Sequence, residues 1–270
     1  MKTVIIIPAR YASSRFPGKP LAMLQLADGS RKSLIELSWE AAKQVEGISE
    51  VYVATDDNRI RNAAIEFGAK VILTSSNCAN GTERCAEALE NANLDADLVI
   101  NLQGDAPLTP PWFIEALIAA MSSDQTAQMA TPVLQVDPVT YGLFTEDRRN
   151  GQVGGTTAIF DRNSNALYFS KEVLPFLQLE QLADKADIPV YHHVGVYAYR
   201  PEALKAYMQW PEGRLEKLEG LEQLRFLENA AQVKCVEVDA RGKVFWELNN
   251  PEDIARIEKV LEALECNRKL

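Results

Sequence analysis

Residues 4–20 read VIIIPARYASSRFPGKP, and this stretch decides the fold. Its four aliphatic residues form a β-branched run that stops at Pro8, a pattern typical of a strand buried on both faces. A loop, residues 8–20, follows this strand at once. Because ligands of open parallel sheets bind at the loops that follow the strands, this loop is the first place to look for a site.

Strands and helices alternate along the first half of the chain. The apolar patterns predict strands at 4–7, 51–55, 70–74 and 97–102, and helices at 32–46, 57–67 and 82–91. Gly68 is placed to close the second of these helices. The alternation predicts an α/β fold with a mostly parallel central sheet.

After residue 126 the pattern is looser, and the second half could be antiparallel or mixed. It predicts strands at 129–136, 154–160, 190–199 and 233–238, an irregular stretch at 137–153, a polar helix-prone stretch at 178–187, a helix at 214–230, a possible strand at 243–248 and a closing helix from Pro251 capped by Asn250. No linker rich in Ser, Gly or Pro separates the halves. We therefore expect a single domain over 1–270 with a smaller, lid-like second half.

Composition limits the functions open to the chain. Its 28 Lys and Arg against 38 Asp and Glu give a formal charge of −10, which repels nucleic acid and anionic membranes. The run at 4–7 is too short for a membrane span or a signal peptide. Four cysteines without a C-x-x-C pair favour reduced thiols over disulfides or a zinc site. We expect a cytoplasmic protein with no nucleic-acid or membrane partner.

Residues 8–20, which we call the basic loop, are positively charged although the chain as a whole is negative. It contains Arg10, Arg15 and Lys19, and no Asp or Glu occurs between residues 1 and 27. Guanidinium groups bind oxygens bidentately and lysine adds a compact charge, so the loop suits a polyphosphate. It lacks the glycine patterns of the P-loop and of dinucleotide-binding folds. A solvated basic turn is the alternative interpretation.

Two further loops of the first half carry polar groups. Asp56 and Asp57 end the second predicted strand, and Asp57 is suited to cap the helix that follows. The segment 80–84, NGTER, turns into a helix. Its N–H groups and Arg84 could hold an anionic or polar group, while Thr82 could be a plain helix cap.

The loop after the fourth predicted strand contains Gly104 and Asp105. Gly104 would let another group approach the backbone closely. Asp105 then offers a hard oxygen ligand where magnesium would bridge phosphates. A turn-forming aspartate beside glycine and proline is the alternative.

Polar side chains also gather in the second half. Alternation through 190–199 places His193 on a face with tyrosines, which suits a hydroxyl-rich ligand, although a structural histidine is the alternative. Glu216 and Glu219 lie one turn apart on the next predicted helix, and Gln223 shares their face. A solvated helix face is the alternative for them.

Eight motifs, in order along nearly the whole chain, resemble those of the sugar-acid cytidylyltransferases, above all the family of 3-deoxy-manno-octulosonate (Kdo) cytidylyltransferases. They are IIIPARYASSRFPGKPL at 5–21, VATD at 53–56, GTER at 81–84, NLQGD at 101–105, LYFS at 167–170, HVGVY at 193–197, LEQLR at 221–225 and NPED at 250–253. The resemblance implies a Rossmann-like nucleotidyltransferase fold, usually in a homodimer. It also implies that CTP and Mg²⁺ are used to make the CMP derivative of an eight-carbon sugar acid, with release of pyrophosphate, for lipopolysaccharide biosynthesis.

The resemblance assigns roles to particular positions. Residues 1–126 become the CTP-binding half, and residues 127–270 the sugar-binding, lid and dimerisation half. The implied catalytic residues are Arg15, Lys19 and Asp105; the implied nucleotide-binding residues are Ala9, Arg10, Ser13, Arg15, Lys19 and Gly81; the implied sugar-binding residues are Arg84, Gln103, His193, Glu216 and Glu219; and the implied metal ligands are Asp105 and Asn249.

Two positions depart from the family pattern. Ala106 stands where the family usually has Glu, and Asn249 stands where it usually has Asp, the second carboxylate for magnesium. Asn249 offers an uncharged oxygen, so metal binding should weaken unless substrate phosphates or Glu247 compensate. Some relatives act on 8-amino-3,8-dideoxy-manno-octulosonate (Kdo8N), which carries an ammonium group. Because altered carboxylates near a site can discriminate a cation, we expect a preference for Kdo8N, with ordinary Kdo as the runner-up.

Other functions remain open on the same fold. A CTP-dependent alcohol cytidylyltransferase and a hexose-1-phosphate nucleotidyltransferase would share it, although the latter typically opens with a Gly-rich loop that this chain lacks. Ala106 and Asn249 also leave open an inactive paralogue that only binds a nucleotide sugar.

Overall fold

The chain folds into two units. In the computed structural model, which describes residues 1–12, 16–178, 187–242, 248, 251 and 253–268 and side chains as far as residue 263, one unit comprises Met1–Glu115 with Ala240–Leu270 and the other Ala116–Asp239. Residues 240–270 were expected in the second half, whereas the structure groups them with the first. The expectation of a single domain stays a prediction.

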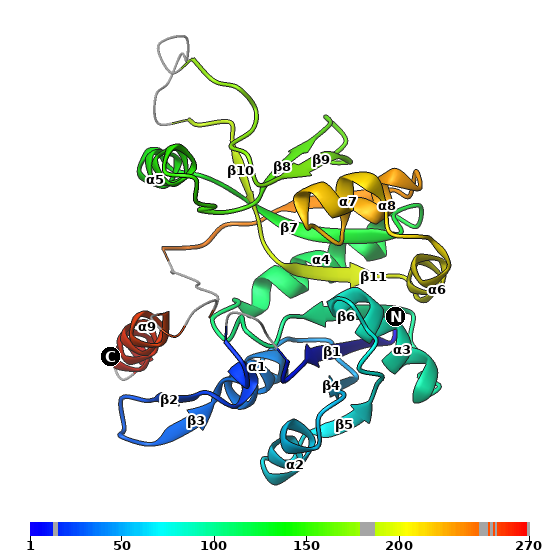
Figure 1. The fold of residues 1–270 in the computed structure, drawn as a ribbon, viewed down its shortest axis with the longest axis vertical. Helices are drawn as coiled ribbons and strands as arrows, with labels where there is room; N and C mark the ends of the chain where they lie inside the picture. Colours follow the sequence, from blue (N-terminus) through cyan, green and yellow to red (C-terminus); the bar gives the residue numbers. More distant parts are fainter. Residues whose placement is uncertain (13–15, 179–186, 243–247, 249–250, 252, 269–270) are drawn as a thin grey trace. The chain divides into compact units, whose positions relative to one another are not determined.

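A parallel sheet forms the centre of the first unit (Figure 1). Its strands lie in the order β5 (Lys70–Leu73), β4 (Glu50–Thr55), β1 (Thr3–Ala9) and β6 (Leu98–Leu102). Each neighbouring pair runs parallel. Ile5, Ile6 and Ile7 of β1 are fully buried, which confirms the predicted strand with two buried faces.

The three helices predicted in the first half are present. They are α1 (Leu34–Lys43), α2 (Asn58–Glu66) and α3 (Gly81–Asn91). The carboxylate of Asp57 caps α2 by accepting from the N–H of Arg59 at 2.8 Å, and Gly68 follows the helix with a φ of 88°. Both end signals were predicted.

A further helix, α4 (Pro111–Ser123), was not predicted from the sequence.

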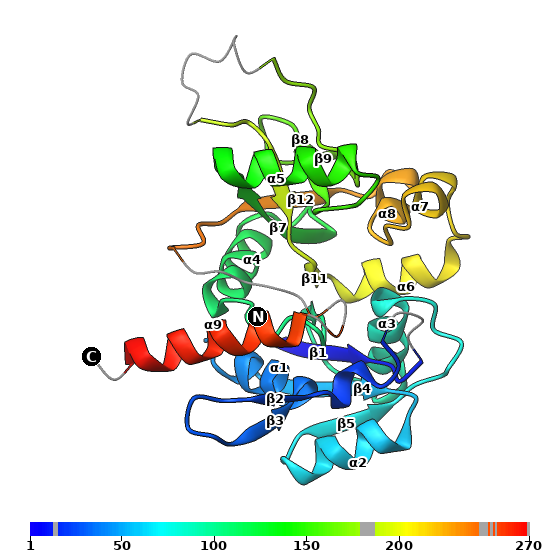
Figure 2. The same cartoon turned by 60° about the vertical axis from the view of Figure 1, so that its left-hand side comes forward.

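A hairpin of β2 (Met23–Gln25) and β3 (Arg31–Ser33) precedes α1, so the predicted helix at 32–46 begins later than expected. Helix α9 (Asp253–Arg268) lies beside β2 (Figure 2), and Oε1 of Glu258 accepts from the N–H of Gln25 at 2.8 Å. An apolar cluster of Leu24, Leu34, Leu37, Leu108, Leu248 and Ile257 joins these parts. The predicted cap Asn250 and residues 243–247 of the possible strand lie outside the described residues.

The second unit contains a mixed sheet around β7 (Met129–Gln135). Strands β10 (Tyr191–His193) and β11 (Val196–Tyr199) pair with β7 in antiparallel direction, and β12 (Val233–Glu237) pairs with it in parallel. Strands β8 (Thr157–Phe160) and β9 (Ala166–Ser170) extend the sheet beyond β10. The mixed topology is confirmed. The predicted strand at 190–199 is two strands, because the chain leaves one part of β7 after β10 and joins another with β11.

The helices of the second unit differ most from the prediction. The stretch predicted as irregular holds α5 (Pro138–Arg149), which Asp137 caps and Pro138 begins. The predicted helix at 214–230 is α7 (Arg214–Glu219) and α8 (Leu224–Glu228), because Gly220 takes a φ of 62° and ends α7. Helix α6 (Pro201–Gln209) was not predicted. The polar stretch at 178–187 lies mostly outside the described residues. Among the described helices, none combines the length and apolar composition needed to cross a bilayer.

Gly104, directly after β6, provides a test of the close approach between the loops that follow β6 and β1. A Cβ added there would lie 3.0 Å from the carbonyl oxygen of Pro8 and 3.3 Å from Cδ1 of Ile35. We expect Gly104→Ala to lower the free energy of unfolding by about 1–2 kcal/mol in urea titrations, because the backbone must shift. Gly142→Ala, with open space around the added atom, is the control and should be neutral or stabilising by about 0.5–1 kcal/mol. Equal midpoints for Gly104→Ala and the wild type would contradict the contact.

Candidate active site

The basic loop leaves the carboxyl end of β1. Ala9, the last residue of that strand, is buried, while Arg10 is exposed and its Nη1 donates to the carbonyl oxygen of Ala79 at 3.5 Å. This long hydrogen bond brings Arg10 to the segment that leads into α3. Ser13 and Arg15 lie outside the described residues.

Gly18 turns the basic loop back toward the sheet. Its φ of 73° lies in the left-handed region, which glycine adopts without a steric penalty. Its N–H donates to the carbonyl oxygen of Tyr11 at 2.9 Å and closes the loop. The short 3-10 helix η1 (Lys19–Leu21) begins at the next residue, so this turn sets the position of Lys19.

Lys19 forms an ion pair with Asp105, which follows β6. The two side chains are only 16% and 25% exposed, respectively. The turn around Asp105 is held by the hydroxyl of Ser38, which donates to the carbonyl of Gly104 at 3.1 Å, and by the N–H of Leu248, which donates to the carbonyl of Asp105 at 2.9 Å. The structure therefore brings together Lys19 and Asp105, two of the three predicted catalytic residues. Asp105 also lies in a turn, as the alternative of a turn-forming aspartate predicted.

The amino end of α3 lies against the segment after β6. A Cβ added at Gly81 would approach Nε2 of Gln103 to 2.8 Å, so these two predicted site residues are neighbours. Nε2 of Gln103 donates to Oδ1 of Asn101 at 3.2 Å. The helix cap is Asn80, which accepts from the N–H of Glu83 at 2.9 Å. The alternative of Thr82 as the cap is therefore wrong.

Arg84 is buried and already has protein partners. Its side chain is 3% exposed, and Nη1 lies 3.1 Å from Oδ1 of Asp56 and 2.6 Å from Oγ1 of Thr74. Asp56 at the end of β4 thus holds the guanidinium that the sequence assigned to the sugar acid. The sequence showed both residues, but nothing in it indicated that they pair.

Cys78, two residues before the cap of α3, is a protonated thiol. Its Sγ donates to Oε2 of Glu87 at 3.0 Å. Burial and the charge of Glu87 raise the pKa of the Cys78 thiol to about 12. Cys85 and Cys235 are also buried free thiols, as predicted for reduced cysteines.

In the second unit, two buried nitrogens lie around Tyr197. The ring of His193 is centred 5.6 Å from that of Tyr197, and the hydroxyl of Tyr197 donates to Oε1 of Gln223 at 3.4 Å. Among the described residues, Nε2 of His193 and Nε2 of Gln223 have no hydrogen-bond partner. Unpaired buried nitrogens of this kind suit a ligand with hydroxyl groups. The rings of His193, Tyr197 and Tyr199 lie next to one another, as part of the predicted face requires. Gln223 adds a candidate that its spacing from Glu219 and its place in the LEQLR motif indicated.

The imidazole of His193 is neutral in the folded protein. Burial, together with the neighbouring His192, lowers its pKa from 6.5 to about 3. One ring nitrogen therefore accepts and the other donates, which lets the ring bind a hydroxyl group in either sense.

Glu216 is an internal partner of the protein. It is 4% exposed, and its two oxygens accept from Nε and Nη2 of Arg225, each at 2.7 Å. Its Oε2 also accepts from the N–H of Gly213 at 3.2 Å. The interpretation of a solvated helix face is wrong here, and both oxygens of this predicted sugar-binding residue are already bonded.

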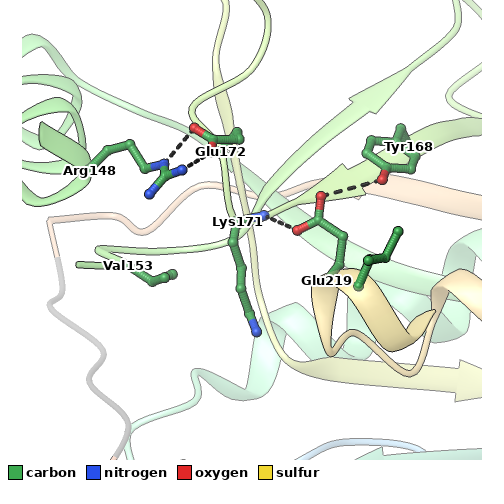
Figure 3. A pocket seen from close by; sticks show the side chains of 7 residues that line it. Arg148, Val153, Tyr168, Lys171, Glu172 and Glu219 are labelled. Carbon is green, nitrogen blue, oxygen red and sulfur yellow. Dashed lines mark hydrogen bonds and ion pairs between the residues drawn. The ribbon is translucent and has the colours of Figure 1, made fainter. Parts of the chain in front are cut away.

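Glu219, by contrast, lines an open pocket of about 410 Å³ (Figure 3). Its carboxylate accepts from the hydroxyl of Ser170 at 2.7 Å, the hydroxyl of Tyr168 at 3.3 Å and the N–H of Lys171 at 3.0 Å. These donors are uncharged, so the negative charge of Glu219 is fixed in place but not neutralised by them. Figure 3 shows the Lys171 side chain running away from this carboxylate.

A second carboxylate on the wall of this pocket is neutralised. Nε of Arg148 donates to Oε2 of Glu172 at 2.6 Å, and the pair is also bonded through Nη2 and Oε1. Glu172 and Glu219 therefore offer different charges to a ligand in the same pocket.

Comparisons with known proteins give one consistent family. A family model described as Cytidylyltransferase matches residues 4–236. The chain is 42% identical over 263 residues to the 3-deoxy-manno-octulosonate cytidylyltransferase of Maricaulis maris, covering 97% of this chain and 98% of that protein. It is also 42% identical over 256 residues to the 8-amino-3,8-dideoxy-manno-octulosonate cytidylyltransferase of Shewanella pealeana, covering 94% and 96%. The structure of CMP:2-keto-3-deoxy-manno-octonic acid synthetase complexed with CTP has a TM-score of 0.81 at 34% identity, covering 99% of this chain and all of that one.

The pKa of His193 predicts how stability depends on pH. Because the pKa is about 3 when folded and 6.5 when unfolded, the unfolded chain binds an extra proton between these values. The stabilisation by neutral His193 is complete above pH 6.5 and is lost as the pH falls toward 3, by up to about 1.4 kcal/mol per pH unit. His193→Gln should therefore show a shallower loss of unfolding free energy between pH 6.5 and about 4.5.

Urea titrations at several pH values measure this slope. Tyr197→Phe, which keeps the imidazole, is the control and should follow the wild-type slope. If His193→Gln and the wild type lose stability at the same rate, the histidine is not buried and neutral.

Proposed function

Because this chain belongs to the cytidylyltransferase family, we propose that it transfers CMP from CTP to an eight-carbon 3-deoxy sugar acid and releases pyrophosphate. The observation that carries this proposal is the ion pair of Lys19 and Asp105. It joins a cation suited to phosphate oxygens and a carboxylate suited to a metal ion at neighbouring loops of the parallel sheet.

The chemistry follows from the charges of CTP. The anomeric hydroxyl of the sugar attacks the α-phosphorus in line and gives up its proton to water as the new O–P bond forms. The bond to the bridging oxygen breaks as pyrophosphate leaves with its electron pair. The protein contributes mainly position and charge. Arg10 and Lys19 supply positive charge to the phosphate oxygens. Arg15 of the same loop would add to this charge, and Ser13 would add a neutral hydroxyl donor. The protein backbone at Ala9, the end of β1, and at Gly81, the start of α3, would contact the nucleotide.

We propose Mg²⁺ as the cofactor, held by Asp105 with Asn249. The donor set fits, since Asp105 offers a carboxylate that is a quarter exposed, and Leu248, the residue before Asn249, is hydrogen-bonded to Asp105. Within the described residues, no group of three or more His, Cys, Asp or Glu is placed to hold a metal ion. Mg²⁺ needs no such group, because it commonly takes one or two carboxylates with water and substrate phosphates. When bound, it would neutralise charge on the phosphate oxygens.

The sugar acid would be bound by polar groups that the fold leaves available. In the second unit, Nε2 of His193 and Nε2 of Gln223 are the buried candidates for its hydroxyl groups. In the first unit, Gln103, which lies beside Gly81, is the candidate. Glu216 acts through its partner Arg225, because both of its oxygens are already bonded. In Arg84, Nη1 is paired with Asp56, and the rest of the guanidinium is the part proposed for the sugar acid.

Within the proposed substrate class, Kdo8N is favoured over Kdo. An ammonium group needs a carboxylate that no cation has neutralised. The hydrogen bonds of Glu219 come from three uncharged donors, whereas Glu172 is paired with Arg148. Arg148 and Lys171 also line the pocket, so Glu219 is the carboxylate that the ligand ammonium would share with them. The remaining parts of the proposal are a homodimer, a cytoplasmic location and a role in lipopolysaccharide biosynthesis, which rest on the family.

Replacement of Asp105 tests the reaction itself. Asp105→Asn should lower kcat for pyrophosphate release by about 100-fold or more, because the neutral amide neither binds the metal ion as strongly nor pairs with Lys19. Asp95→Asn, which removes the same charge at a side chain that is 93% exposed, is the control and should keep wild-type kinetics. Near-normal turnover of Asp105→Asn across a magnesium titration would refute the role of this residue. If the wild type released no pyrophosphate with any sugar acid, only an inactive binding paralogue would remain.

Paired kinetics test the choice of sugar. We expect kcat/KM with Kdo8N to exceed that with Kdo by about tenfold, the value of one charge-assisted hydrogen bond. Glu219→Gln should remove most of this preference, and the control Glu172→Gln should affect the two sugars equally. A kcat/KM that favours Kdo would refute the preference. An equal loss for the two sugars in Glu219→Gln would refute the role of the carboxylate.

A further inference from the structure

We propose that Arg59 is a positioning residue for CTP: it fixes the basic loop by holding the ring of Tyr11. The inference rests on the proposed function, because it concerns the loop proposed to bind the triphosphate. Arg59 is on α2, outside that loop and outside every motif that carries the family resemblance.

The contact between Arg59 and Tyr11 is a stacked one. Cζ of the guanidinium lies 3.3 Å from the centroid of the Tyr11 ring, which is the close, face-on geometry of a cation–π pair. Arginine suits this contact because its guanidinium is planar and lies flat on a ring, which a lysine ammonium cannot do.

Asp57 fixes the guanidinium in this orientation. Its Oδ1 accepts from Nε at 3.0 Å and its Oδ2 accepts from Nη2 at 2.6 Å, so the ion pair is bidentate. The same carboxylate caps α2 through the N–H of Arg59. The anchor is therefore the start of a helix, and Arg59 lowers the pKa of Asp57 as expected for a paired carboxylate.

The other side of Tyr11 is bound to the turn that sets Lys19. An added Cβ at Gly18 would come within 3.0 Å of Cε2 and Cζ of the Tyr11 ring, so the ring edge packs directly on this glycine. The N–H of Gly18 also donates to the carbonyl of Tyr11 at 2.9 Å. Holding Tyr11 thus holds Gly18, and Gly18 precedes the Lys19 that pairs with Asp105.

Arg59 acts through Tyr11 in this arrangement. Its guanidinium presents one edge to Asp57 and one face to the ring, and the effect on nucleotide binding that we propose passes through this ring. Without the stack, Tyr11, Gly18 and Lys19 must be held in place by CTP itself, and the cost appears as weaker binding of CTP.

The test compares Arg59→Ala with Arg61→Ala, which removes the same charge from an exposed position on the same helix. Arg59→Ala should raise KM for CTP about fivefold, the size of one exposed cation–π contact, with kcat and the KM for the sugar acid unchanged within twofold. Arg61→Ala should match the wild type. Arg59→Lys, which keeps the charge and loses the planar group, should resemble Arg59→Ala.

Variants of Tyr11 separate the stack from a general effect on folding. Tyr11→Phe keeps the ring and should bind CTP as the wild type does, while Tyr11→Leu should raise KM as Arg59→Ala does. The double variant of Tyr11→Leu with Arg59→Ala should be no worse than Tyr11→Leu alone, because the contact that Arg59→Ala removes is already lost in it. Since the two substitutions change opposite ends of one contact, either one tests it if the other folds poorly.

Three results would overturn the inference: an unchanged KM for CTP in Arg59→Ala, a wild-type KM in Arg59→Lys, or additive effects in the double variant. Calorimetry with CTP alone separates this failure from that of the proposed function. A wild type that does not bind CTP refutes the proposed function, whereas wild type and Arg59→Ala with equal affinity for CTP refute only the role of Arg59.

Discussion

The ion pair between Lys19 and Asp105 is the interaction on which the proposed chemistry depends. It forms because β1 and β6 are neighbouring parallel strands, so the loops that follow them leave the same edge of the sheet. Gly104 lets the second loop pass against Pro8, and Gly18 turns the first one back. Two charges that are largely removed from water each require a partner. Phosphate oxygens can take the place of Asp105 as the partner of Lys19, and a metal ion can take the place of Lys19 as the partner of Asp105.

Much of the first unit was predictable, because its strands are short aliphatic runs and its helices carry local end signals such as Asp57 and Gly68. In the second unit, the points where helices and strands are interrupted carry no such local signal. The helical spacing of its glutamates continues across Gly220, where the backbone turns. The alternation at 190–199 continues while the chain moves along β7. Helix α5 was missed although Asp137 and Pro138 begin it, because its polar residues and glycine resemble a loop.

The sequence also identified the residues of the candidate site better than their partners. Lys19 and Asp105 were predictable because each follows a strand of one parallel sheet. The pairing of Arg84 with Asp56 was not, since folding alone brings those distant positions together and so decides whether a charge is available to a ligand. The stack of Arg59 on Tyr11 has the same origin. Motifs indicate which side chains take part, and packing decides how.

Cys78 lies immediately before the residue whose carbonyl accepts from Arg10. Because burial and Glu87 raise the pKa of this thiol to about 12, it stays protonated at pH 7. Peroxides and electrophilic compounds attack the ionised form, and a sulfur that is both buried and protonated reacts slowly with them. The segment before α3 therefore carries a sulfur atom near Arg10 of the proposed nucleotide site in a form that reacts slowly with oxidants and electrophiles.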